Sequence, residues 1–253
     1  PGLDPAFDRD KFLVRQKHLS ISKKYHVWDE AGSAILFVER PSHLFRSLVA
    51  ILAGIAAGGI VWAVFGFLGG AIFGNGDGMG VMLVMGAGVG LVTLLAVAIA
   101  ITPKRHILFY RDDSKAELLM DALQDKKLYF LNATYTVRDA SQNVLARLRK
   151  NYIYNIFRKR WYCERPDGSL WVIAKEDSLI LSLLRRFLGP FFGLLRTNFV
   201  ILAPGTEQVL GEFNRKFTLL DRYVLDMTPD RDCHVDRRVA VALGILLDTG
   251  EKR

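Results

Sequence analysis

Hydrophobic and polar residues alternate through most of the chain, which is the pattern of half-buried β-strands. Residues 24–40, KYHVWDEAGSAILFVER, alternate, turn at EAGS and alternate again. Similar hairpins begin at Tyr135, Trp161 and Asn198, and further strands are predicted over 12–16, 106–111, 127–132 and 216–227. About ten to twelve short strands with short connections predict an antiparallel barrel or sandwich.

One segment inside this β pattern has a helical period instead. Residues 114–127, SKAELLMDALQDKK, place Glu117 three positions after Ser114, as in a capping box. The apolar side chains that follow form one stripe on a helix, namely Leu118, Leu119, Ala122 and Leu123. The segment therefore predicts a surface helix.

A second helical segment lies near the C terminus. Residues 236–249, DRRVAVALGILLDT, begin with Asp236, a good N-cap residue. Residues 239–247 are hydrophobic on every side but too few to cross a bilayer. We therefore expect a buried helix inside a closed barrel of about twelve strands, a mainly β fold.

Residues 47–102 interrupt the alternation with two charge-free apolar runs. The runs cover 47–73 and 79–102, and the glycine-rich segment 74–78 separates them. Each exceeds the roughly 20 residues that a helix needs to cross a membrane. The chain thus predicts a transmembrane hairpin, with 1–46 as the first strands of the barrel and 103–253 as the remainder. The alternative, a buried helix pair in a soluble core, is disfavoured because neither run has a polar face.

Charges flanking the hairpin predict its orientation. Arg40 and Arg46 precede the first run, Lys104 and Arg105 follow the second, and the connecting loop carries only Asp77. The positive-inside rule places such basic flanks in the cytoplasm. We expect an integral, two-pass membrane protein with both termini cytoplasmic.

Glycines recur every four residues within both apolar runs. Small residues at this spacing let helix backbones approach closely. They predict packing of the two helices against each other, and the alternative is a homo-oligomer formed through the outer glycine face. The predicted packing positions are Gly54, Gly58, Gly66, Gly70, Gly86 and Gly90.

The formal net charge of +8 lies almost wholly outside the apolar runs. Beside a membrane, basic residues attract anionic phospholipid, at about 1 kcal/mol for each well-placed Lys or Arg. Nucleic acid is the other common partner of such a charge, and the hairpin argues against it. The lipid-binding candidates are Arg147, Arg149, Lys150, Arg158, Lys159 and Arg160 in segment 146–161, with Arg185 and Arg186 in the amphipathic segment 178–197. The alternative for the first group is a solvated strand face, and for 178–197 a strand and loop packed on the barrel.

Candidate catalytic chemistry is absent from the sequence. No GxSxG, P-loop or HExxH motif occurs, so we expect no enzyme. Cys163 and Cys233 lack metal-site spacing and are predicted to be reduced thiols. The polar opening segment 1–17 predicts no signal peptide.

The paired segments YHVWDEAG and YTVRDASQ, with the strands and helix of 211–249, resemble the tubby-like superfamily of tubby proteins, plant LURP-one-related proteins and phospholipid scramblases. The resemblance covers 12–40 and 106–249. It implies a twelve-stranded barrel around a hydrophobic C-terminal helix. The hairpin is a departure, since familiar members lack this insertion.

The resemblance also implies function. It suggests binding of anionic phospholipid at the cytoplasmic leaflet and assistance to lipid scrambling. Scramblases carry an acidic, Ca²⁺-associated segment before the helix, where this chain has Asp226, Asp230, Asp232 and Asp236. An EF-type Ca²⁺ loop needs a bidentate acid at its twelfth position, but counting from Asp226 that position is Arg237. The alternative to a Ca²⁺ site is that these acids lie in a solvated turn. The alternative function is a membrane-tethered scaffold or sensor that binds a protein or small ligand through the barrel.

Overall fold

The computed structural model describes residues 3–17, 22–74, 76–127, 132–151, 159–176, 199–206, 208–216 and 222–251. The chain divides into two compact units. One contains Pro1–Pro41 and Arg105–Arg253, and the other is Ser42–Lys104.

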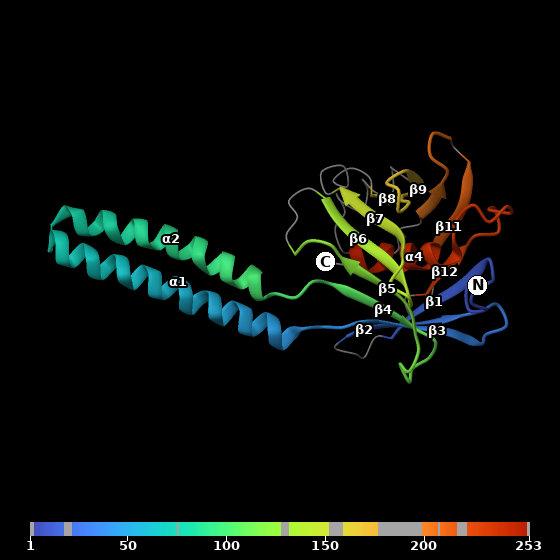
Figure 1. Cartoon of the computed structure of the whole chain (residues 1–253), viewed down its shortest axis with the longest axis horizontal. Coiled ribbons are helices and arrows are strands. Elements are labelled where there is room, and N and C mark those ends of the chain that lie inside the picture. The colour runs from blue at the N-terminus through green and yellow to red at the C-terminus, as the bar shows by residue number, and fades with distance from the viewer. Residues whose placement is uncertain are drawn as a thin grey trace. The chain divides into compact units, whose positions relative to one another are not determined.

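The larger unit is a closed antiparallel β-barrel, which confirms the predicted fold class (Figure 1). Each strand pairs with its neighbours in sequence, and β1 pairs with β12 to close the cylinder. Closure leaves no open sheet edge to template aggregation. Within the described ranges the strands are β1 (Lys11–Lys17), β2 (Lys23–Trp28), β3 (Ala34–Arg40), β4 (His106–Tyr110), β5 (Leu118–Gln124), β6 (Asn132–Asp139), β7 (Val144–Asn151), β8 (Arg160–Glu164), β9 (Leu170–Glu176), β10 (Phe199–Leu202), β11 (Val209–Lys216) and β12 (Arg222–Asp226).

The apolar insertion separates two neighbouring strands of this barrel. β3 and β4 pair antiparallel, with Val38 opposite Phe109. The 63 residues of the second unit lie between these two strands in the sequence. Both partners of this pair are fully buried. The barrel therefore forms only when the chain returns from the insertion, as the split pattern of the sequence indicates.

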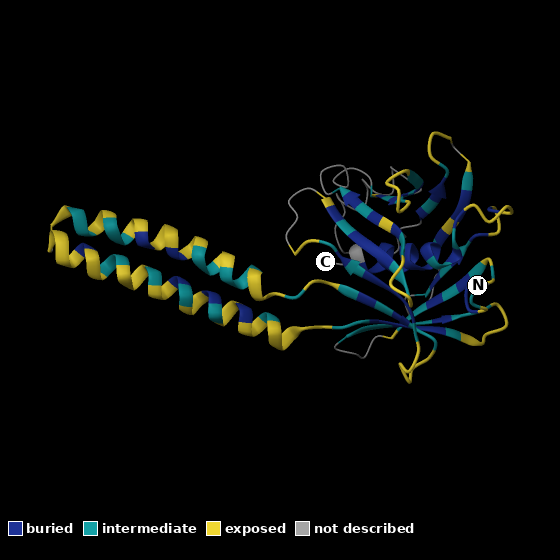
Figure 2. Ribbon diagram, viewed as in Figure 1, coloured by how far each residue is buried: buried dark blue, intermediate teal, exposed yellow. Residues whose placement is uncertain are grey.

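The C-terminal helix α4 (Arg237–Glu251) lies inside the barrel, where Figure 2 shows it dark blue among the strands. Every residue from Val239 to Leu247 is buried. Each buried Val, Leu or Ile contributes roughly 1.5–3 kcal/mol relative to an exposed one. The predicted N-cap is confirmed, because Asp236 Oδ1 accepts a hydrogen bond from the Arg238 backbone N–H at 2.9 Å. Gly244 lets Phe213 approach, since a Cβ there would lie 3.2 Å from the phenyl ring.

The predicted surface helix over 114–127 is wrong. Residues Leu118–Gln124 form β5, which pairs with β4 and β6. The capping box does not form, because Glu117 pairs with Arg111 and the Ser114 hydroxyl bonds to Asp112. A short apolar run satisfies both periods, and two neighbouring strands with unpaired backbone groups decide in favour of the strand.

The smaller unit consists of two antiparallel helices, α1 (Leu44–Phe73) and α2 (Asp77–Ile101). Both are long and apolar enough to cross a membrane, with mean hydropathy of 2.4 and 2.5. At 1.5 Å per residue they extend about 45 and 37 Å. Large apolar side chains such as Phe45, Phe67 and Val84 are exposed on their surface.

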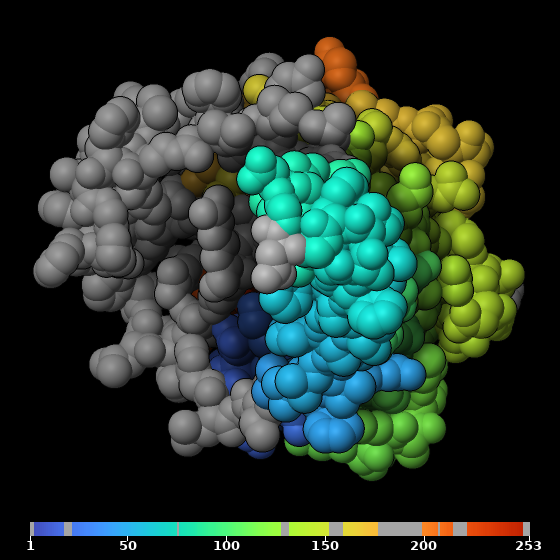
Figure 3. Space-filling model, turned by 90° about the vertical axis from the view of Figure 1, so that its left-hand side faces the viewer, coloured from blue at the N-terminus to red at the C-terminus, as the bar shows by residue number. Residues whose placement is uncertain are grey.

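Glycines allow the two helix backbones to meet, and the space-filling view from the hairpin tip shows the helices in contact (Figure 3). A Cβ on Gly58 would lie 2.6 Å from the Gly90 carbonyl oxygen, and one on Gly54 would lie 2.7 Å from the Leu94 oxygen. Gly86 is equally tight against the Phe65 side chain.

Not every predicted glycine lies at this interface. Gly66 makes only ordinary contact, with Leu83 at 3.4 Å from its built Cβ, and Gly70 has nothing within 4 Å. Gly69, which the spacing did not single out, faces Met82 at 2.9 Å. The interface therefore uses a different glycine from the predicted one near the tip, because a 3.6-residue helix turns away from a strict four-residue spacing.

Candidate functional site

The antiparallel strand order gathers basic residues at one end of the barrel, hereafter the basic end. Odd-numbered strands end there and even-numbered strands begin there, so β3 leaves and β4 returns at this end. Among the described residues, the acids at these strand ends and adjoining turns are Glu39, Asp125 and Glu176. The cations at the same positions are Lys17, Lys23, Lys24, Arg40, Arg105, Lys126, Lys127, Lys150, Lys159, Arg160, Lys175 and Arg222.

The opposite end of the barrel, hereafter the acidic end, carries most of the described Asp residues. Asp29 and Glu30 lie in the β2–β3 turn, and Asp167 lies in the β8–β9 turn. Several acids pair with arginine, as Asp4 does with Arg111. The net positive charge of the chain is thus concentrated at one end, which gives the barrel a charge asymmetry along its axis.

Two of the predicted basic residues share the outer face of β7, as alternation requires. Arg147 is exposed, and Arg149 lies on the same face. The Arg149 guanidinium contacts Glu164 at 2.9 Å and lies 5.7 Å from the Tyr162 ring centroid. Arg147 is therefore the better placed of the two to meet a ligand.

Lys150 lies on the inner face of β7. It is 5% exposed, and its Nζ lies 5.6 Å from the centroid of the Trp161 ring inside the barrel. The structure therefore separates Lys150 from Arg147 and Arg149, because successive side chains of a strand point to opposite faces.

The remaining predicted cations fall into two groups. Arg160 is exposed, Lys159 is half-buried, and Lys175 lies opposite Arg160 on β9. Lys175, which sequence reasoning missed, joins the site through strand register alone. Arg158, Arg185 and Arg186 lie outside the described residues.

A polar layer closes the barrel interior at the basic end. Tyr25 and Tyr223 donate hydrogen bonds to the two oxygens of Asp248, at 2.6 and 2.5 Å. Burial, together with the Asp248 carboxylate, raises the pKa of Tyr25 far above its ordinary value. Arg40 donates to the Thr249 carbonyl at 3.3 Å, where the negative end of the α4 dipole favours a cation.

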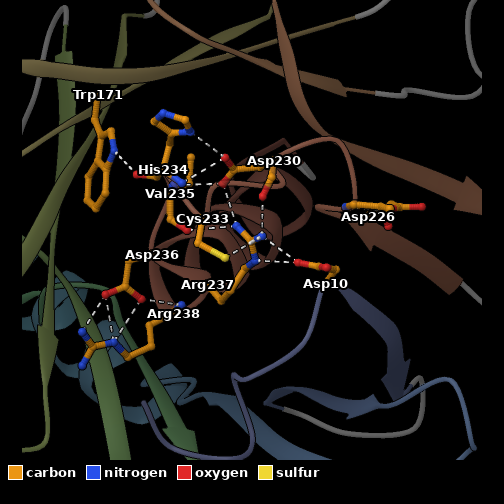
Figure 4. Close-up of polar contacts among 11 residues, drawn as sticks. Asp10, Trp171, Asp226, Asp230, Cys233, His234, Val235, Asp236, Arg237 and Arg238 are labelled. Carbon is orange, nitrogen blue, oxygen red and sulfur yellow. Dashed lines mark hydrogen bonds and ion pairs between the residues drawn. The ribbon is translucent and has the colours of Figure 1, made fainter. Parts of the chain in front are cut away.

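At the acidic end, the acids before α4 form a structural cluster around Arg237 (Figure 4). The side chains of Asp230 and Arg237 are 0% and 4% exposed, and Arg237 Nη1 lies 2.7 Å from Asp230 Oδ2. Asp230 also accepts the backbone N–H groups of His234 and Val235, each at 3.0 Å. Arg237 Nη2 reaches the more exposed Asp10 at 2.6 Å.

The environment of Asp230 favours its charged form. Burial alone would raise the pKa of this carboxyl, but hydrogen bonds from Val235, Arg237 and His234, with the charge of Arg237, outweigh it. The pKa therefore lies below the ordinary value of 3.8. Because its oxygens already accept hydrogen bonds from several protein donors, we interpret Asp230 as a residue that stabilises the fold.

The acids before α4 do not fit a Ca²⁺ site. Asp230 is engaged by protein donors, and Asp236 is paired with Arg238 at 2.6 Å. Asp226 lies apart from the cluster in Figure 4, and Asp232 is exposed. Ca²⁺ needs several converging oxygens, and within the described ranges no group of three or more His, Cys, Asp or Glu residues could hold a metal ion.

Both cysteines are free thiols, with Cys163 in the barrel core and Cys233 exposed. Burial, together with the negative charge of Glu164, raises the pKa of Cys163 to about 12. This thiol is therefore inert at neutral pH.

No model of a known protein family matches the chain, and no curated protein is significantly similar to it. The class of protein is thus defined by the structure. It is a closed antiparallel barrel around an apolar helix, with two long apolar helices inserted between β3 and β4.

Proposed function

We propose that this protein is a membrane-anchored, tubby-like barrel whose basic end binds anionic phospholipid at the cytoplasmic leaflet. The observation that carries the proposal is the concentration of Lys and Arg at the end of the barrel where β3 ends and β4 begins. The insertion leaves and returns at that same end. The tubby-like assignment is supported by the closed barrel around an apolar C-terminal helix.

Chain length supports a short distance between the basic end and the bilayer. Residues 41–43 join β3 to α1, and residues 102–105 join α2 to β4. Four extended residues span at most about 14 Å, which is less than two Debye lengths in physiological salt, where one is roughly 8 Å. The basic residues are thereby kept at high effective concentration near lipid headgroups.

Flanking charges support the proposed topology, with both termini in the cytoplasm. Arg40, Arg46, Lys104 and Arg105 border the hairpin, and Asp77 begins α2 near its turn. The cytoplasmic leaflet is the one rich in anionic lipid. Lipid scrambling follows from the family resemblance alone, so the proposal is confined to lipid binding.

Retention of phosphatidylglycerol by the full chain tests this function. Purified protein in neutral detergent micelles is titrated with phosphatidylglycerol or phosphatidylcholine, and bound lipids are counted by native mass spectrometry. We expect a preference for phosphatidylglycerol that weakens at high salt. Replacing Lys17, Lys23, Arg160 and Lys175 by Gln should weaken it at least tenfold, since each cation contributes up to about 1 kcal/mol.

A matched variant at the acidic end shows whether the lipid preference depends on the cations of the basic end or on the total charge of the protein. Lys11, Arg138, Arg165 and Arg231 lie at that end, and their replacement by Gln removes the same four charges. This variant should retain the wild-type preference. Equal retention of both lipids by the wild type, or equal losses in the two variants, would reject the proposal.

A further inference from the structure

Two arginines face each other on the outer surface where the barrel closes. Arg15 on β1 is the direct register partner of Arg222 on β12. Their neighbours Val14 and Tyr223 point into the core, so both arginines point outward. Opposed Cβ atoms in an antiparallel pair lie about 4.5–5.5 Å apart, and like charges directly opposite each other are destabilising.

Nothing in the described part of the chain neutralises this pair. Among the described residues no carboxylate contacts either guanidinium, and Arg222 Nε is buried without a hydrogen-bond partner there. On its other side Arg15 lies opposite His26, whose ring contacts Asp113 at 2.7 Å. Buried donors are normally paired, so the unsatisfied Nε–H indicates a missing acceptor. Two positive charges side by side indicate that this acceptor is an anion.

A groove extends from these arginines along β1. It encloses about 320 Å³ and is lined by Leu13, Arg15, Trp28, Arg222, Tyr223 and Val224, among others. The Arg15 guanidinium carbon lies over the Trp28 ring, 4.8 Å from its centroid, which is within the range of a cation–π interaction. The groove therefore has the two arginines on one side and a mostly apolar wall of Leu13, Trp28 and Val224 on the other.

We propose that Arg15 and Arg222 bind a phosphate group, with an attached apolar group lying against Leu13, Trp28 and Val224. Guanidinium groups match phosphate oxygens with paired N–H donors. A bound phosphate turns the repulsion between the arginines into attraction and supplies an acceptor to Arg222 Nε. The phosphate comes from a phospholipid headgroup or from a free phosphorylated compound.

This inference deepens the proposed function, and its lipid source rests on that function. The phosphate-binding site at Arg15 and Arg222, hereafter the seat, can be tested independently of the membrane function. The variant used above to test the basic end leaves both arginines unchanged. A wild type that binds phosphate but retains both lipids equally would reject the membrane function alone. A wild type that prefers phosphatidylglycerol but does not bind phosphate would reject the seat alone.

Thermal unfolding of the full chain in neutral detergent tests the seat, with inorganic phosphate titrated against chloride at constant ionic strength. We expect a saturable rise in Tm of roughly 3–6 °C at ten times Kd. Arg222→Gln should abolish this rise. It should also leave Tm in phosphate-free buffer unchanged or higher, because the like-charge pair is gone, whereas a purely structural Arg222 would lower it.

Arg138→Gln is the control, since it removes the same charge from another outward strand position. It should retain the phosphate response. Short-chain phosphatidic acid identifies the source: tighter binding than phosphate, lost in Leu13→Ser, indicates a lipid headgroup, and equal binding indicates a free phosphate compound. The seat is overturned if the wild type shows no saturable shift, or if Arg138→Gln loses the shift as Arg222→Gln does.

Discussion

Asp230→Ala is expected to lower the free energy of unfolding of the barrel by about 3–5 kcal/mol, because it leaves a buried arginine without its inner carboxylate. Asp230 and Arg237 are almost completely buried, and Asp10, the remaining acidic partner, is half exposed. Two backbone N–H groups also lose their acceptor. Equilibrium urea unfolding of the full chain in detergent, followed by tryptophan fluorescence, measures the change.

Asp232→Ala is the matched control, since Asp232 is an exposed acid two residues away. We expect it to change stability by no more than about 0.5 kcal/mol. Similar losses in both variants would contradict the structural role of Asp230. Stabilisation of the wild type by Ca²⁺ that is lost in either variant would instead favour a metal site.

The same carboxylate predicts a pH dependence. Its pKa is lowered in the folded state, so its contribution is present above the ordinary value of 3.8 and is lost as pH falls through the folded pKa. The difference in stability between wild type and Asp230→Asn should therefore shrink below about pH 4. A difference that stays constant down to pH 2 would show that ionisation of Asp230 is not involved.

Gly58→Leu is expected to separate the two long helices. A Cβ at this position lies 2.6 Å from the Gly90 oxygen, which is backbone and cannot rotate away. Helices packed through larger side chains lie 8–10 Å apart, so we expect the gap to widen by about 2–3 Å. Spin labels on cysteines at Val49 and Ile101, measured by double electron–electron resonance with Cys233 replaced by Ser, report this distance.

Gly59→Leu provides the control at the adjacent residue, since nothing lies within 4 Å of its built Cβ. The distance between the labels should not change in this variant. Burial protects Cys163, so it does not compete for the label. If Gly59→Leu widens the hairpin and Gly58→Leu does not, the helix interface described here is wrong.

Local patterns were sufficient to predict most of the fold. Period-two alternation identified the strands flanking turns such as the one at Gly32, and all-round hydrophobicity identified α4. The error at β5 arose because Leu118, Leu119, Ala122 and Leu123 fit both periods. Only pairing with β4 and β6, which is not encoded locally, distinguishes the strand from a helix.

The sites required three-dimensional information. Asp10 and Arg237 are separated by 227 positions in sequence, so no spacing rule could pair them. Arg15 and Arg222 become neighbours only when the barrel closes. Lys150 was grouped with Arg147 and Arg149 by sequence proximity, although one residue of shift moves a side chain to the opposite face.

Depth measurement at the two barrel ends tests the central claim, that the basic end is held against anionic headgroups. Strands of up to eight residues separate the ends by roughly 20 Å, beyond the range of headgroup contact. With Cys233 replaced by Ser, a fluorophore is attached to a cysteine at Lys126, at the basic end, or at Asp167, at the acidic end. The full-length protein is reconstituted with phosphatidylglycerol and headgroup-nitroxide lipid. The account predicts strong quenching at 126, weak quenching at 167, and a smaller difference in high salt. Equal quenching at the two positions, or stronger quenching at 167, would contradict it.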